Sequence, residues 1–209
     1  MPKQVDHHQR RQEIADAVCR LVAAHGLHEV SLRHVADEAG VSMGQVQHYF
    51  NSKDEMLLFA FQTLSERVEA RIGAAVREAP QPPTQRAILS ALLREMLPLG
   101  EQARAEAPVW VAFLARAIVE PRLAVPFHQD GRALYGFVGD QIRSAQHAGV
   151  APAMLDPDRE ANTLLALADG MMIQMLVGQL DISDALATLD YHLDRIFTGD
   201  GRGSREVSG

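Results

Sequence analysis

The sequence predicts an all-α fold. Apolar residues recur at helical spacing along most of the 209 residues, and no stretch alternates as a half-buried strand would. Hydrophobic residues make up 47% of the chain, which is enough to bury a sizeable core. Proline, glycine and capping residues divide the chain into about nine predicted helices.

Two short helices are predicted first. Apolar residues at helical spacing over residues 14–22 form one stripe, and Gly26 is placed to end that helix. Ser31 can cap a second helix, which Gly40 ends after little more than two turns. The two helices leave only a short linker between them.

A third short helix begins at Ser42. Gln45 lies three residues further on, so the two side chains can form a capping box with the backbone. Val46 and Phe50 are its expected inward anchors. The outward face would then carry Met43, Gly44, Gln45, Gln47 and His48. So polar a face on so short a helix suggests contact with another molecule.

A long fourth helix follows from a second capping box at Ser52 and ends at the proline-rich residues 79–84. Proline at first-turn positions (Pro108, Pro157) and glycine near helix ends indicate where the remaining helices begin and end. The remaining helices are predicted near 84–97, 108–119, 127–148, 157–178 and 183–197. We expect a small domain over residues 1–53, a larger helical domain over 54–199 and a disordered tail over 200–209.

The second and third helices match a helix-turn-helix. Gly40 supplies the tight turn and Val41 is an inward wedge between the helices. Glutamine side chains can pair with adenine, and a helix start with nearby serine and lysine suits phosphate oxygens. Although the net charge is −7, residues 1–53 carry as many basic as acidic residues, so the excess acidity lies further along the chain. Double-stranded DNA is therefore the inferred partner.

The stretch SLRHVADEAGVSMGQVQHYFNSKDEML resembles the TetR family of bacterial transcriptional regulators. The match runs from Arg10 to Met56, and the chain differs from many members at Met43, Gln45 and Gln47. The run LLALADGMMIQMLVG more loosely resembles the branch that includes the choline-responsive repressor of betaine synthesis. The resemblance implies a homodimeric repressor that binds a palindromic operator and releases it when a small-molecule effector binds. The expected DNA contacts are Ser31, Arg33, Ser42, Met43, Gly44, Gln45, Gln47, His48, Tyr49 and Lys53.

The C-terminal half offers candidates for the effector and for the dimer. An aromatic and Met-rich wall suits an amine-like or hydrophobic ligand, although a Met stripe is also typical of a core or a dimer interface. Asp169 would be a ligand anchor or an exposed interface charge. The ligand candidates are Trp110, Phe113, Glu120, Tyr135, Asp169, Met172 and Met175. The dimer candidates are Leu164, Ala168, Met171, Leu186, Leu189 and Leu193.

Other classes of function find little support. The chain has no catalytic motif, no Cys- or carboxylate-completed metal site and no sign of a cofactor, so an enzyme is not expected. Cys19 is expected to be a buried small hydrophobe. No apolar run is long enough to span a bilayer, which predicts a cytoplasmic protein. The alternatives are an activator or ligand-independent regulator, a helical protein-interaction module, and a helical enzyme that uses Asp169 and nearby histidines.

Overall fold

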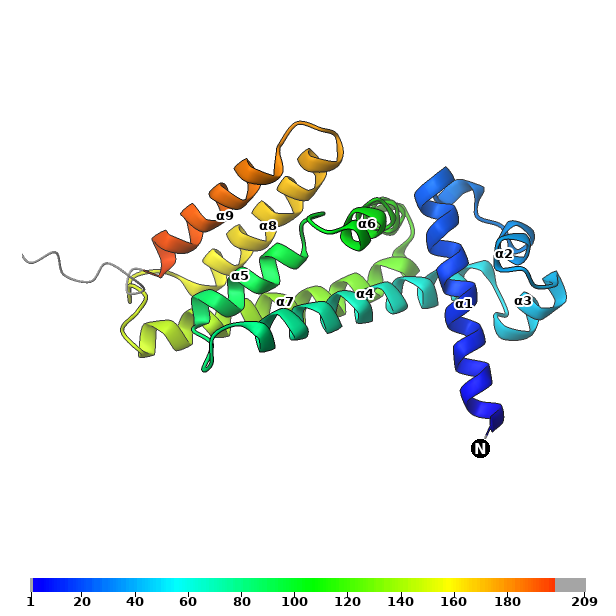
Figure 1. The fold of residues 1–209 in the computed structure, drawn as a ribbon, viewed down its shortest axis with the longest axis horizontal. Helices are drawn as coiled ribbons and strands as arrows, with labels where there is room; N and C mark the ends of the chain where they lie inside the picture. The colour runs from blue at the N-terminus through cyan, green and yellow to red at the C-terminus, as the bar shows by residue number, and fades with distance from the viewer. Residues whose placement is uncertain (1, 198–209) are drawn as a thin grey trace, which may run out of the picture. The chain divides into compact units, whose positions relative to one another are not determined.

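The computed structural model describes residues 2–197, without the side chains of residues 2–6, 126, 127, 129 and 130. The predicted tail over 200–209 lies outside these residues. All regular elements of the described chain are helical (Figure 1), which confirms the all-α prediction. They are α1 (Pro2–His25), the 3-10 helix η1 (Leu27–Glu29), α2 (Leu32–Ala39), α3 (Met43–Tyr49), α4 (Lys53–Glu78), α5 (Gln85–Glu95), α6 (Glu101–Val119), α7 (Pro121–His147), α8 (Pro157–Leu176) and α9 (Ile182–Ile196).

The helices form two compact units. Among the described residues, the first contains residues 2–71 and 98–130, and the second contains residues 72–97 and 131–197. Helices α1, α2, α3 and α6 therefore belong to the first unit, and α5, α8 and α9 to the second. The predicted boundary after residue 53 lies inside the first of these units, and it stays a prediction.

The first unit has a single apolar core. Ile14 and Val18 of α1 are fully buried together with Val35 of α2 and Val46 of α3. Burying these aliphatic side chains contributes roughly 1.5–3 kcal/mol each, which holds the short helices α2 and α3 against the longer α1. In the same core, Phe61 of α4 packs against Trp110 and Phe113 of α6.

Three helices begin earlier than predicted. Helix α1, predicted as a short helix around the apolar stripe of residues 14–22, runs over 24 residues from Pro2. Pro108 lies inside α6, which starts at Glu101, so the prediction of Pro108 as a first-turn marker was wrong. Proline removes one backbone hydrogen bond, yet the alanines of EQARAEA favour the helix on its N-terminal side, and the Arg104 side chain donates to the Leu99 carbonyl (2.8 Å) just before the helix. Helix α7 begins at Pro121, whose fixed φ suits a first helical position.

The second unit packs α5 against α8 and α9. Figure 1 shows α8 and α9 side by side, and buried leucines from both helices form the core between them. Ion pairs add to this packing: Arg86 of α5 lies 2.6 Å from Asp194 of α9, and Arg94 of α5 lies 3.0 Å from Asp190. Among the described residues, no helix is long and apolar enough to cross a membrane.

Candidate functional site

The turn between α2 and α3 is built from local capping. The Ser31 hydroxyl accepts a hydrogen bond from the backbone N–H of His34 (3.2 Å) and starts α2. Gly40 ends α2 with φ of +66°, a left-handed conformation that glycine adopts without steric cost. The Val41 N–H then donates to the Ala36 carbonyl (3.0 Å), which closes the turn. The chain leaves this turn directly into α3.

Helix α3 is attached to its unit by very few side chains. Val46 is fully buried and is the only buried residue within this helix, and Phe50 follows it at the C-cap. Of the ten residues predicted to contact DNA, Ser31 and Tyr49 are half-buried. The other eight are exposed: Arg33, Ser42, Met43, Gly44, Gln45, Gln47, His48 and Lys53. The outward face of α3 is therefore accessible to a partner.

The start of α3 has the complete capping box that its sequence predicts. The Ser42 hydroxyl accepts from the Gln45 N–H (3.2 Å), and the Gln45 side-chain oxygen accepts from the Ser42 N–H (2.9 Å). Two backbone donors that the helix cannot satisfy itself are thereby paired. This geometry fixes the orientation of the first turn of α3.

Aromatic rings gather at the end of α3. The Tyr49 ring centroid lies 4.7 Å from that of His7 in α1 and 5.2 Å from that of His48. Edge-to-face ring pairs at these distances are favourable. Tyr49 thus contributes to holding α3 against α1, whereas the neighbouring His48 remains exposed.

The start of α4 is tied to the end of α3. The Glu55 carboxylate accepts hydrogen bonds from the backbone N–H (2.9 Å) and the side chain (3.0 Å) of Asn51, and Arg11 of α1 lies 3.4 Å away. Arg11 was not predicted to have a role, because its partners lie about 40 residues further along the chain. Lys53 is exposed at the first position of α4.

The predicted effector residues divide between the two units. In the first unit, Phe61 packs on Trp110 (5.1 Å between centroids) and on the buried Phe113 (5.6 Å), and Glu120 pairs with Arg116 (3.5 Å). The second unit contains an exposed Tyr135, a buried Met172, and Asp169 and Met175, which are half-buried. Burial raises the pKa of Asp169, because desolvation disfavours its carboxylate.

Five of the six predicted dimer residues lie in the core of the chain itself. Leu164, Ala168, Met171, Leu189 and Leu193 are buried within the second unit, and Leu186 is half-buried. Their side chains therefore have little surface left for a partner. Ile173 of α8, Val177 at the C-cap of α8 and Tyr191 of α9 are exposed apolar residues.

Comparison with known families assigns both parts of the sequence. Residues 14–59 match the family model of bacterial regulatory proteins of the TetR family, and residues 83–198 match the C-terminal region of BetI-type transcriptional repressors. The second match alone covers more than half of the chain. The first match contains the complete helix-turn-helix of α2 and α3.

Individual relatives agree with this assignment. The chain is 34% identical to the regulator PksA of Bacillus subtilis over 88% of its length and 86% of the relative. It is 30% identical to the regulator BetI of Burkholderia thailandensis, covering 93% of this chain and 96% of the relative. A regulator from Saccharomonospora viridis, solved in complex with choline, is 27% identical with a TM-score of 0.74 over 90% of this chain and 94% of its own. These relatives are regulators and not enzymes, and the chain belongs to the TetR family of bacterial transcriptional regulators, with a C-terminal region of the BetI type.

Proposed function

We propose that this regulator is a ligand-responsive repressor that binds a palindromic operator as a homodimer through α3. The observation that carries the DNA contact is Gly44. A Cβ at this position would meet only the Ser42 hydroxyl, at an ordinary 3.9 Å. Nothing in the described fold therefore requires glycine, although glycine lowers helix stability by roughly 0.5–1 kcal/mol relative to alanine. A DNA backbone or base edge that approaches α3 closely would explain it.

The Gly44→Ala variant tests this proposal. We expect its thermal unfolding temperature to rise, because alanine favours the helix. Its affinity for DNA from the intergenic region upstream of its own gene should fall at least tenfold. Gly136→Ala is the matched control, since Gly136 lies in α7 and a Cβ there would meet nothing within 4 Å, so alanine fits without a clash at both positions. It should gain stability and keep full affinity. Unchanged DNA binding by Gly44→Ala would contradict the proposed role of α3.

A protein-docking role for the same helix is the alternative, and salt separates the two. DNA affinity should fall steeply as salt rises, because phosphate contacts release condensed counterions. A weak salt dependence of partner binding would favour protein docking. The description of the matched C-terminal region as a repressor supports repression over activation.

The proposed dimer would use the outer faces of α8 and α9. Val177 at the C-cap of α8 and Tyr191 in α9 are 63% and 60% exposed, and a second copy of the chain would cover this apolar surface. A two-fold pairing of these helices would place two copies of α3 in successive major grooves, about 34–36 Å apart. This arrangement accounts for a palindromic operator.

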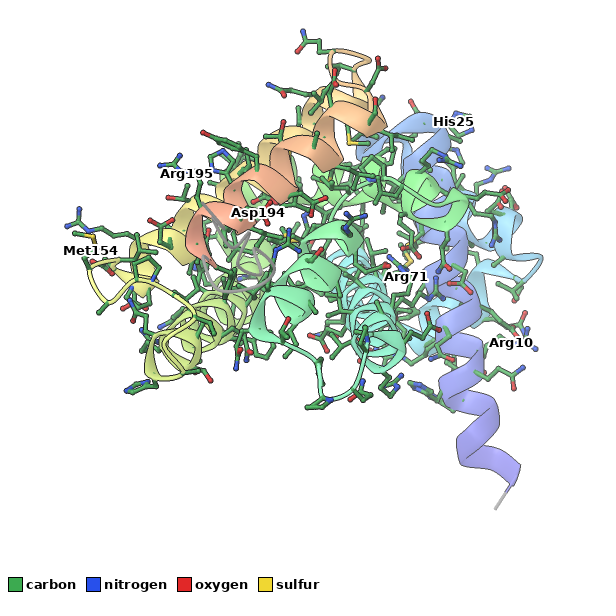
Figure 2. All side chains as sticks on the ribbon, turned by 60° about the vertical axis from the view of Figure 1, so that its left-hand side comes forward. Arg10, His25, Arg71, Met154, Asp194 and Arg195 are labelled. Carbon is green, nitrogen blue, oxygen red and sulfur yellow. The ribbon has the colours of Figure 1, made fainter. Side chains whose placement is uncertain are left out.

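Sedimentation of charged variants tests the interface. Ile173→Asp combined with Tyr191→Asp should shift the protein from dimer to monomer, because two buried unpaired charges would oppose association. Met154→Asp is the matched control: Met154 is 91% exposed and projects from the loop before α8 (Figure 2). Dimers that survive the double substitution at normal strength would exclude this face.

The proposed effector is a cationic amine, anchored by Asp169. This half-buried carboxylate has no hydrogen bond or ion pair among the described residues, so a bound cation would supply the opposite charge that it lacks. The choline bound to the Saccharomonospora viridis regulator supports a quaternary ammonium ligand. Release of DNA requires that the ligand prefer the DNA-free conformation, and a coupling of about 1–3 kcal/mol is enough for a useful response.

Calorimetric titration with choline chloride tests the effector. The wild type should bind choline and should release operator DNA in its presence, whereas Asp169→Asn should lose at least tenfold in choline affinity. Asp184→Asn, which changes an exposed carboxylate at the start of α9, is the control. Equal choline affinity in wild type and Asp169→Asn would refute the anchor.

A further inference from the structure

The two glutamines on the outer face of α3 differ in what they can offer a partner. Gln45 lies 2.9 Å from the backbone nitrogen of Ser42. Since that nitrogen is a donor, the side-chain atom that bonds it must be the amide oxygen. What Gln45 presents outward is therefore chiefly its NH2 group, with two N–H donors.

The side chain of Gln47 takes no part in the capping box. It is exposed, and no hydrogen bond within the described residues involves its side chain. Its amide keeps both the oxygen and the NH2 group available, which is the pair of atoms that bonds the N6 and N7 positions of adenine together. The chain thus holds two copies of the same side chain, two residues apart, in different hydrogen-bonding states.

We propose that Gln45 reads guanine, as a donor to its O6 and N7 atoms, while its oxygen stays in the capping box. Guanine is the only base that presents two adjacent acceptors in the major groove. Adenine presents the N6 amino group, a donor, where guanine presents O6, so it would face the NH2 donors of Gln45. Gln45 could offer its oxygen to adenine only if the capping bond broke, which would leave the Ser42 N–H without a partner. This assignment rests on the proposed function of α3 as the DNA-reading helix.

The variant Gln45→Glu separates the two properties of this residue. Glutamate at this position also completes a capping box, and its charge is favourable in the first turn, so the thermal unfolding temperature should not fall. The outward atom changes from a donor to an acceptor. Gln47→Glu is the matched control, because it adds the same charge to the same face without touching the capping box.

Selection from a pool of randomised duplexes gives the readout. The wild type should select a guanine at one position of each half-site, and Gln45→Glu should prefer guanine there at least about tenfold less and turn to cytosine, which offers a donor. Gln47→Glu should alter a different position and keep the guanine. If the wild type selects adenine at the position that depends on Gln45, or if Gln45→Glu keeps the wild-type base preference there, the guanine assignment is wrong but the proposed DNA binding is not affected. A wild type that enriches no sequence would overturn the proposed DNA binding as well.

Discussion

Arg11 of α1 lies over the ring of Phe59 in α4, with its guanidinium carbon 4.3 Å from the ring centroid. The same guanidinium lies 4.7 Å from the centroid of Phe50, which follows α3. Arg11 also approaches the Glu55 carboxylate, which bonds Asn51. One side chain therefore joins α1 to both ends of the connection between α3 and α4.

Replacement of Arg11 by alanine should destabilise the first unit. Loss of cation-π contacts and of the packed aliphatic stem is expected to lower the free energy of unfolding by about 1–2 kcal/mol, measured by urea denaturation. Arg10→Ala is the control, because among the described residues Arg10 pairs with Glu13 on the same helix, where both side chains are solvent-accessible, and it should cost less than about 0.5 kcal/mol. Equal losses in the two variants would show that the stacking contributes nothing.

A second prediction concerns the ion pair of Arg71 in α4 with Glu106 in α6. The two side chains are 2.8 Å apart, and Glu106 is only 13% exposed. Glu106→Gln leaves a largely buried cation facing a neutral group, and the free energy of unfolding should fall by roughly 2–4 kcal/mol. The double variant Arg71→Met with Glu106→Leu should recover most of this loss. If the double variant is less stable than Glu106→Gln, the ion pair contributes more stability than the desolvation of its two charges costs.

Cys19 is half-buried against the apolar core rather than fully buried as predicted, and it should react only slowly in the folded protein. Burial raises the pKa of its thiol from 9.0 to about 11, which lowers the thiolate fraction near neutral pH about 100-fold. Alkylation by iodoacetamide should be slower than for an exposed cysteine by at least that factor, and should reach the ordinary rate in concentrated urea. Rapid alkylation of the native protein would mean that the thiol is accessible.

The stability of the protein should depend on pH through Asp169. Its folded-state pKa is raised above the ordinary 3.8, so the folded state binds the proton more tightly than the unfolded state does. This contribution is complete below pH 3.8 and is lost as pH rises through the folded pKa. Asp169→Asn should therefore be more stable than wild type at neutral pH, and the gap should close in acid. Parallel stability curves across that range would argue against the shift.

The sequence was sufficient for the features of the site that depend on neighbours along the chain. The Ser31 cap, the Gly40 turn and the box of Ser42 with Gln45 all join residues three to five positions apart, so their spacing alone predicts them. Val46 could be assigned to the core because a helix of two turns has one inward face.

Contacts across the fold could not be predicted in this way. The stack of Arg11 on Phe59 joins residues 48 positions apart, and no local pattern indicates it. An apolar stripe such as that of Met171 and Leu189 shows that side chains are buried but not by which chain, and here the partners are helices of the same unit. Pro108 was misassigned because helix-forming neighbours outweighed its cost.

The attachment of α3 through Val46 has an evolutionary consequence. Since a few inward side chains (Val46, Tyr49 and Phe50) and a local cap hold this helix, most outward positions can mutate with little penalty to folding. Duplicated copies of the gene could then diverge in their target sequences while their stability stays constant. A scaffold of this kind allows new regulatory circuits to arise by a few surface substitutions.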